Sequence, residues 1–313
     1  MFAIAVTLLP TEPAGAQSEV GAEPAPKSKP PPYSLPFQLR PAVAASVVRY
    51  DTELAFYRDP VTHDSGSTMA SMLLVSYKVT EQLAPLVRLG WVWNSPAELP
   101  PLKPTPKSAV GFLNPVVGAL YALKLSPELK LAFFLGLTVP VGSGGGNSPD
   151  PARAAANRAG IPARSAMDNS MFAVNDFAVF PGVDFAYVAH GFTAQVEATL
   201  FQLTRVRGDA PAVPDASRTN FTTGLHLGYF FAPFISVGAE LRHQRWLSTP
   251  KAVENDPTHT LRDTTTVAFG PRFHIPLGEK TWLRPAVALV LPLDNPMADA
   301  RYKIVQIDVP FAF

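Results

Sequence analysis

The sequence predicts an all-β protein, a single closed antiparallel transmembrane β-barrel of about twelve strands, with short turns at one end and long loops at the other. Three observations predict this fold. Apolar and polar residues alternate along most of the chain after residue 36, short and long connections alternate between those segments, and the chain ends in phenylalanine. A period of two residues places the apolar and polar sets on opposite faces of a strand.

The composition suits strands that cross a membrane. Hydrophobic residues make up 47% of the chain and charged residues 16%, whereas a soluble domain carries about 25% charged residues. No stretch reaches the roughly 18 consecutive apolar residues that a membrane-spanning helix needs. The apolar residues are therefore spread thinly, as alternating strands require.

Several partners and site types are not expected from the composition. The formal net charge is +1 and no run is rich in Lys or Arg, so no nucleic acid partner is expected. Cysteine is absent, which excludes disulfides and thiolate metal ligands, and the six His are scattered. We therefore expect no metal site and no cofactor.

The chain divides into three predicted parts. Residues 1–16 are predicted to be a signal peptide, because a short apolar stretch is followed by Ala14-Gly15-Ala16, the small-x-small form of a cleavage site. No Lys or Arg precedes the apolar stretch, so we expect that the signal is truncated at its start or begins upstream. Residues 17–36 are predicted to be a flexible Pro-rich linker, and residues 37–313 the barrel.

The alternation defines the predicted strands. In the last of them Val305, Ile307 and Val309 share one face, and Gln306 and Asp308 share the other. An apolar row facing lipid and a polar row facing the lumen is the pattern of transmembrane barrels. The predicted strands lie near 40–57, 67–80, 84–95, 109–124, 128–141, 176–189, 191–206, 218–231, 234–247, 263–277, 281–293 and 301–313.

The connections support the same fold. They are short after the even-numbered strands and longer after the odd-numbered ones. Bacterial outer-membrane barrels have short periplasmic turns and longer extracellular loops. A soluble β-sandwich would show the same alternation, but it gives no reason for this asymmetry. An open sheet would leave unpaired backbone groups in hydrocarbon, so the predicted sheet has to close on itself.

Two resemblances extend the prediction. The C-terminal run with Phe311 and Phe313 resembles the signal that the outer-membrane assembly machinery reads, and segments 113–125 and 129–146 look like small-molecule channel barrels of the phenol-degradation MetA-pathway type. The resemblance implies a channel-like protein of a Gram-negative bacterial outer membrane. Its implied partners are outer-membrane lipid, the assembly machinery and a small solute whose identity stays open.

The inward-facing polar residues are the candidate site. We expect a channel or porin-like transporter that passes small solutes through a narrow polar lumen. The alternative is a structural or adhesive barrel with a closed lumen, in which these charges pair with one another. About eight strands leave an interior filled by side chains and about sixteen leave an aqueous channel, so twelve lies between. The candidates are Arg49, Asp51, Glu53, Arg88, Asp184, Glu197, His226, Glu240, Arg242, Gln244, Arg272, Arg284 and Asp308.

Loop 142–175 is the longest irregular segment. Its glycine run lacks the Lys-Ser/Thr that a phosphate-binding loop requires. Asp150-Pro151 predicts the start of a short helix that ends at Gly160. The loop arginines Arg153, Arg158 and Arg164 are candidates to fold inward and constrict the pore, with a simple extracellular cap as the alternative.

A barrel enzyme is a minor alternative. An outer-membrane phospholipase needs a His and a Ser on the lipid-facing wall, but His63 and Ser65 are predicted in a loop. An omptin-like protease needs Asp pairs and an Asp-His pair at the extracellular rim, where Asp59, His63 and Asp64 are predicted. Three polar residues in a loop are common, so we expect no enzymatic activity.

Deleting Phe313 should leave synthesis and export intact but reduce insertion into the outer membrane several-fold, because the assembly signal would be lost. The amount of heat-modifiable barrel in the membrane fraction measures this. A normal amount after deletion would mean that Phe313 is only another strand residue.

Overall fold

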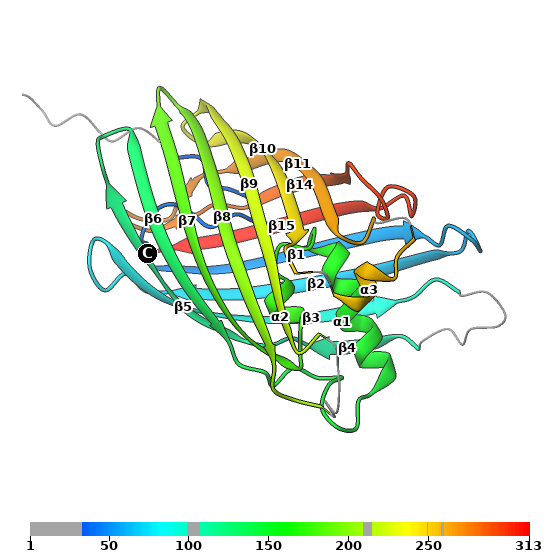
Figure 1. Ribbon diagram of the computed structural model, residues 1–313. Helices are drawn as coiled ribbons and strands as arrows, with labels where there is room; N and C mark the ends of the chain where they lie inside the picture. The colour runs from blue at the N-terminus through cyan, green and yellow to red at the C-terminus, as the bar shows by residue number, and fades with distance from the viewer. Residues whose placement is uncertain (1–32, 99–106, 209–214, 249, 258–259) are drawn as a thin grey trace, which may run out of the picture. The chain divides into compact units, whose positions relative to one another are not determined.

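The computed structural model describes residues 33–98, 107–208, 215–248, 250–257 and 260–313. These residues form one antiparallel sheet in which each strand pairs with the next along the barrel wall. The first strand, β1 (Val47–Arg58), also pairs with the last, β15 (Lys303–Ala312), in a continuous register from Val47 opposite Ala312 to Phe56 opposite Lys303. This pairing closes the sheet into a barrel (Figure 1).

The other strands follow in chain order. They are β2 (Ser65–Ser76), β3 (Leu83–Ser95), β4 (Ala109–Phe112), β5 (Val116–Lys124), β6 (Leu129–Thr138), β7 (Asp176–Ala189), β8 (Phe192–Arg205), β9 (Ser217–Ala232), β10 (Ile235–Trp246), β11 (Asp263–Phe273), β12 (Ile275–Pro276), β13 (Trp282–Leu283) and β14 (Ala286–Pro292).

These segments amount to twelve crossings of the barrel wall within the described residues, as predicted. Both β4 and β5 pair with β3, so they are two halves of one crossing, interrupted at 113–115. Likewise β11 with β12, and β13 with β14, each make one crossing. Pro115 and Pro285 lie at two of the interruptions, where a residue without an N–H cannot continue the ladder.

The predicted alternation holds in the structure. On β10 the side chains of Val237 and Leu241 are 37% and 41% exposed on the outer face, whereas Glu240 and Arg242 are fully buried on the inner face. A charge on the lipid face near the bilayer midplane would cost about 2–4 kcal/mol, so this orientation is the one a membrane requires. The fold is that of a bacterial outer-membrane barrel.

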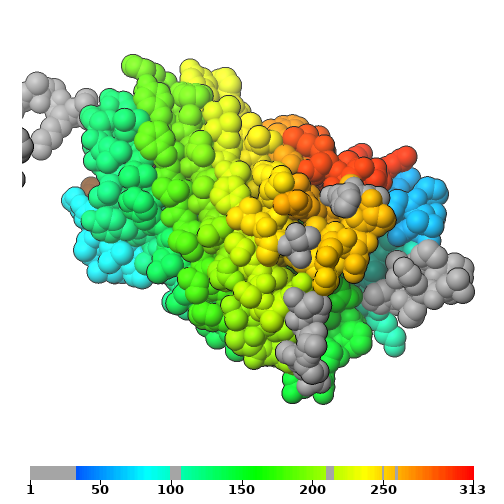
Figure 2. Space-filling view, viewed as in Figure 1, coloured from blue at the N-terminus to red at the C-terminus, as the bar shows by residue number. Residues whose placement is uncertain are grey.

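The connections follow the predicted asymmetry, except that the first two, 59–64 and 77–82, are equally long. Both β1 and β15 reach the short-turn end, at Val47 and Ala312. The longest connection, between β6 and β7, contains α1 (Pro151–Ala163) and α2 (Asn169–Phe172), and the β10–β11 connection contains α3 (Lys251–Glu254). In Figure 2 the connections after β6, β10 and β14 (green, gold and red) gather at the long-loop end. None of the described helices is long and apolar enough to cross a membrane.

Helix α1 begins where the sequence predicts but ends three residues later. The Asp150 side chain accepts hydrogen bonds from the backbone N–H groups of Ala152 (2.9 Å) and Arg153 (3.2 Å), with proline at the first helical position. The expected end at Gly160 is wrong, because Gly160 is buried against Phe172 and Val92 inside the helix, which continues to Ala163. Tertiary packing therefore overrides the glycine stop signal here.

The first strand also starts later than predicted. It begins at Val47 rather than near residue 40, and residues 33–46 lead from the barrel interior to the wall, where the carbonyl of Ser46 accepts from the N–H of Phe313. The backbone N–H groups of Ser34, Phe37 and Arg40 donate to side chains of the wall and not to a neighbouring strand. We call residues 33–46 the lumen segment. It includes 33–36, the end of the predicted linker; the predicted signal peptide and the rest of that linker lie outside the described residues.

The orientation of the barrel can be tested with single cysteines, because the chain has none of its own. Ser148→Cys, on an exposed long loop, and Ser217→Cys, exposed at the long-loop end of β9, should react with a membrane-impermeant maleimide on intact cells. Gln82→Cys, exposed on a short turn, should react only after the outer membrane is opened. Labelling in the reverse pattern would show that the barrel has the opposite orientation in the membrane.

Candidate functional site

The structure places the thirteen candidate lumen residues on the inner face of the wall. All are buried except Arg88 and Arg284, which are partly exposed. Burial of so many charged groups requires that each finds partners, because an unpaired buried charge is costly. The partners come partly from the wall and partly from two segments that fill the lumen.

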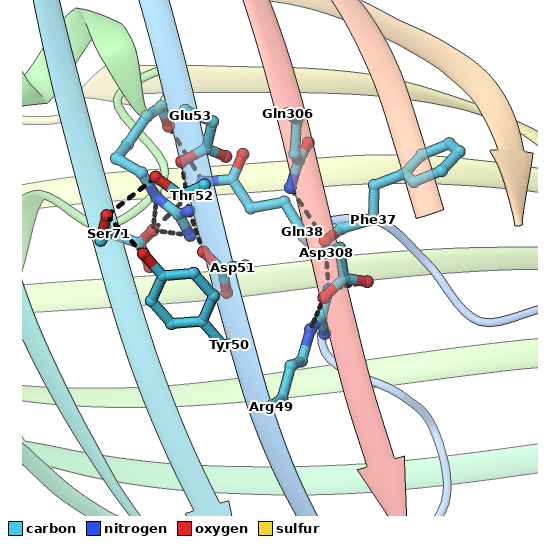
Figure 3. A network of polar contacts seen from close by, with 12 residues as sticks. Phe37, Gln38, Arg49, Tyr50, Asp51, Thr52, Glu53, Ser71, Gln306 and Asp308 are labelled. Carbon is cyan, nitrogen blue, oxygen red and sulfur yellow. Dashed lines mark hydrogen bonds and ion pairs between the residues drawn. The ribbon is translucent and has the colours of Figure 1, made fainter. Parts of the chain in front are cut away.

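The lumen segment is held by its backbone carbonyls on one side of the barrel. The carbonyl of Phe37 accepts hydrogen bonds from Arg49 and, at 3.0 Å, from Gln306 (Figure 3). The carbonyl of Pro36 accepts from Arg272 at 2.9 Å and from Arg49 at 3.3 Å. These donors belong to β1, β11 and β15, so side chains from three strands bind the carbonyls of the same two residues.

The backbone N–H groups of the lumen segment meet acceptors on other strands. Glu240 on β10 accepts from the N–H of Phe37 and, at 3.1 Å, from that of Gln38. Glu197 on β8 accepts from the N–H of Arg40 at 2.6 Å. Carbonyls and N–H groups of one stretch are thus bound by donors and acceptors of the wall.

Asp308 joins two arginines on the same side of the lumen. Its carboxylate contacts Arg49 Nε at 2.7 Å and Arg272 at 2.6 Å, and all three side chains are buried. Charge-assisted pairs of this kind are among the stronger hydrogen bonds in proteins. Asp308 therefore orients the two guanidinium groups that donate to the lumen segment.

Arg40 of the lumen segment compensates a pair of wall carboxylates. Asp184 and Glu197 lie directly opposite each other on β7 and β8. The Arg40 guanidinium lies 3.5 Å from Asp184 and 3.1 Å from Glu197. Without it, two like charges would face each other inside the barrel.

Arg164 lies between a second pair of wall carboxylates, as Arg40 does for the first. We call residues 139–175 the inward loop, since its middle part enters the barrel. Arg164, fully buried, bonds to both Asp51 and Glu53 on β1 and lies 2.8 Å from Asp168 of its own loop. The two inserted arginines, Arg40 and Arg164, therefore each place one positive charge between two wall carboxylates, and Arg88 of β3 lies 3.6 Å from Asp51 as well.

The two inserted segments also bind each other. Gln38 donates to the carbonyl of Arg164 at 3.0 Å and to the Asp168 carboxylate at 3.1 Å. Asp168 receives Arg88 from β3 at 2.5 Å. Although burial would raise it, the charges of Arg88 and Arg164 hold the pKa of the Asp168 carboxyl well below its usual range. Asp168 is therefore ionised, and it contacts the wall, the inward loop and the lumen segment at once.

The other two loop arginines lie outside the lumen. Arg153 is exposed and lies 3.5 Å from Asp150, and Arg158 is exposed at the rim of a cavity of about 500 Å³ at the long-loop end. Deeper inside, beside Arg88 and Asp168, the cavity between the two inserted segments measures about 60 Å³. It has room for a few water molecules but not for a solute.

The sequence reading missed the residues of the lumen segment. The sequence pattern places Tyr33 in the predicted linker, Phe37 and Gln38 in the barrel just before its first strand, and Arg40 at the start of that strand. Burial raises the pKa of the Tyr33 hydroxyl, which donates a hydrogen bond to the Gln195 side chain. The available signal was the Phe-x-Leu pattern at 37–39 between prolines, which is too short to distinguish an inserted segment from a strand.

The candidate residues of a phospholipase or protease site lie in the β1–β2 connection and at the start of β2. His63, Asp64 and Ser65 are exposed there, and the Asp59 carboxylate accepts hydrogen bonds from the backbone N–H groups of Val61 and Thr62, both at 2.8 Å. Asp59 thus stabilises its own turn. Within the described ranges, no three His, Asp or Glu side chains are grouped so that they could hold a metal ion.

Asp308→Asn should lower the free energy of unfolding by about 3–5 kcal/mol, because it leaves Arg49 and Arg272 buried without a counter-charge. The midpoint of urea unfolding in detergent measures this. The control is Asp263→Asn, which removes an exposed pair with Arg245 and should cost less than about 1 kcal/mol. Equal losses of unfolding free energy in the two variants would contradict a stabilising role of the buried ion pairs in the lumen.

Comparison with known proteins supports the fold. No family model and no curated protein matches the chain. Among solved structures, an outer-membrane channel from Pseudomonas putida F1 is similar over 88% of this chain and 98% of its own, with 15% identity and a TM-score of 0.51. The KdgM porin (10% identity, 85% and 99% covered, TM-score 0.46) and the NanC porin (8%, 84% and 98%, 0.46) are more distant. The chain therefore shares the barrel fold of outer-membrane channels.

Proposed function

We propose that this protein is a porin-like outer-membrane channel for small solutes, closed in this structure by its own lumen segment. One observation carries the proposal: the interior is filled by inserted chain segments and not by the side chains of the wall alone. The lumen segment is bound through hydrogen bonds and ion pairs of its backbone and of Arg40. Water and a polar solute can replace such contacts.

The wall is suited to line an open passage. With the lumen segment displaced, the inner face would present charged and amide side chains of both signs from β1, β7, β8, β10, β11 and β15. The lumen segment enters from the end at which β1 starts, and the chain contains no cysteine that could fix it there. The fold shared with the Pseudomonas putida channel favours the same function.

A closed structural or adhesive barrel is the second candidate. The buried network of Arg164, Asp51 and Glu53 favours it, because ion pairs of this kind hold the inward loop in place. The proposal includes no enzymatic activity, since the chain shares its fold with an outer-membrane channel. Movement of the lumen segment separates the two candidates.

A disulfide between the lumen segment and the wall tests the proposal. A side chain at Gly224 on β9 would meet the side chain of Leu39, so Leu39→Cys with Gly224→Cys should cross-link on oxidation. In planar bilayers the reduced double variant should show discrete conductance steps. Oxidation should abolish them and reductant should restore them, because the segment can no longer leave the lumen.

The matched control is Leu39→Cys alone, whose conductance should not respond to oxidant. Oxidised and reduced double variants that conduct equally would show that solutes pass without movement of the lumen segment. Silence of every form at all voltages would favour the closed structural barrel.

A further inference from the structure

The groups that hold the lumen segment match a peptide backbone in kind and in place. Arg49, Arg272 and Gln306 donate to the carbonyls of residues 36 and 37. Glu240 accepts from the N–H groups of residues 37 and 38. Wall side chains therefore bind both the carbonyl and the N–H groups of these peptide units, as they would those of a free peptide in the same place.

Side chains of β8 also bind backbone N–H and carbonyl groups of the lumen segment. Thr193 accepts from the N–H of Ser34 at 3.0 Å, Gln195 donates to the carbonyl of Arg40 at 2.5 Å, and Glu197 accepts from the N–H of Arg40 at 2.6 Å. These three side chains alternate along one strand and all point inward. The wall thus binds backbone groups at both ends of the stretch 34–40.

Two side-chain pockets accompany the backbone contacts. The Phe37 ring is 1% exposed and lies edge-on to His226, with centroids 6.4 Å apart, while the Arg272 guanidinium lies 5.5 Å from its centre. Gly238 leaves room for this ring, since an added Cβ would lie 3.2 Å from it. Leu39, also 1% exposed, occupies the space above Gly224. The wall is shaped for an apolar residue at these two positions.

We propose that the inner wall is a binding site for short linear peptides, occupied in the resting protein by residues 34–40, and that such peptides are the solutes the channel accepts. The inference rests on the proposed channel function for transport, but not for binding. A free peptide with apolar residues spaced as Phe37 and Leu39 would make the contacts that the tethered segment makes. Because the lumen segment belongs to the same chain, its effective concentration at the site is high, and it competes with free peptide for binding.

The test uses the full chain with its segment weakened. Phe37→Gly with Leu39→Gly removes both buried anchors, and Ala44→Gly with Ala45→Gly is the matched control in the same segment. A fluorescent, end-capped peptide of residues 33–42 should bind the first variant in detergent at least about tenfold more tightly than it binds the control or the unchanged protein. A peptide of the same composition in scrambled order should bind at least about tenfold more weakly than the native order.

Ester analogues test whether the backbone itself is recognised. An ester in place of the Phe37 amide removes the N–H that Glu240 accepts and keeps the side chains. It should weaken binding at least about tenfold, since hydrogen bonds to charged groups contribute most. An ester at Leu39, whose N–H makes none of these wall contacts, is the control. Equal binding of both esters, or of the scrambled peptide, would overturn the inference.

Transport is measured separately, so that the two proposals can fail separately. Proteoliposomes with the weakened variant should swell faster in acetyl-Pro-Phe-Gln-amide than in a sugar of similar mass, and the 33–42 peptide should block conductance. Conductance without peptide binding would refute the peptide site and leave the channel; binding without conductance would support the site and refute the channel. If the double glycine variant does not yield heat-modifiable barrel, Phe37→Ala alone serves for the same measurements.

Discussion

The requirement that every backbone N–H and C=O be paired in hydrocarbon governs this structure. Helices meet it alone, but strands meet it only as a closed sheet. Pairing of β1 with β15 provides that closure, and the continuous register between them fixes which residues of each strand face inward. Because side chains alternate, the same pairing that closes the barrel sends Arg49, Asp51 and Glu53 into the lumen together.

Closure creates an electrostatic problem that the wall does not solve by itself. Two carboxylate pairs, Asp51 with Glu53 and Asp184 with Glu197, each lie close together on the inner face. Arg88 of β3 lies 3.6 Å from Asp51, and the other arginines that contact these pairs arrive on inserted segments, one from each end of the barrel. Arg40 precedes β1, and Arg164 belongs to the loop between β6 and β7. The filled lumen is thus one network that wall and inserted segments complete together.

This division of roles links stability to function. The departure of either inserted segment removes an arginine from between two wall carboxylates, and water entering an open lumen can solvate them in its place. The closed state is therefore stabilised by contacts whose loss is compensated only when the lumen fills with water or with a polar ligand.

The alternation of apolar and polar residues was sufficient to predict the closed barrel, its strand number and which strand residues face inward, and the connection lengths predicted most of its loop asymmetry. It was sufficient because the bilayer imposes one rule, apolar outside, on every strand separately, so each strand carries its own signal in its sequence. Residues 33–46 and the loop around Arg164 obey no such periodic rule. Their positions depend on contacts with residues far away in the chain, such as Phe37 with Glu240 and Gln306, and Arg164 with Glu53. Only the assembled barrel brings those partners within reach, which is why the filling of the lumen emerged from the tertiary structure and not from the sequence pattern.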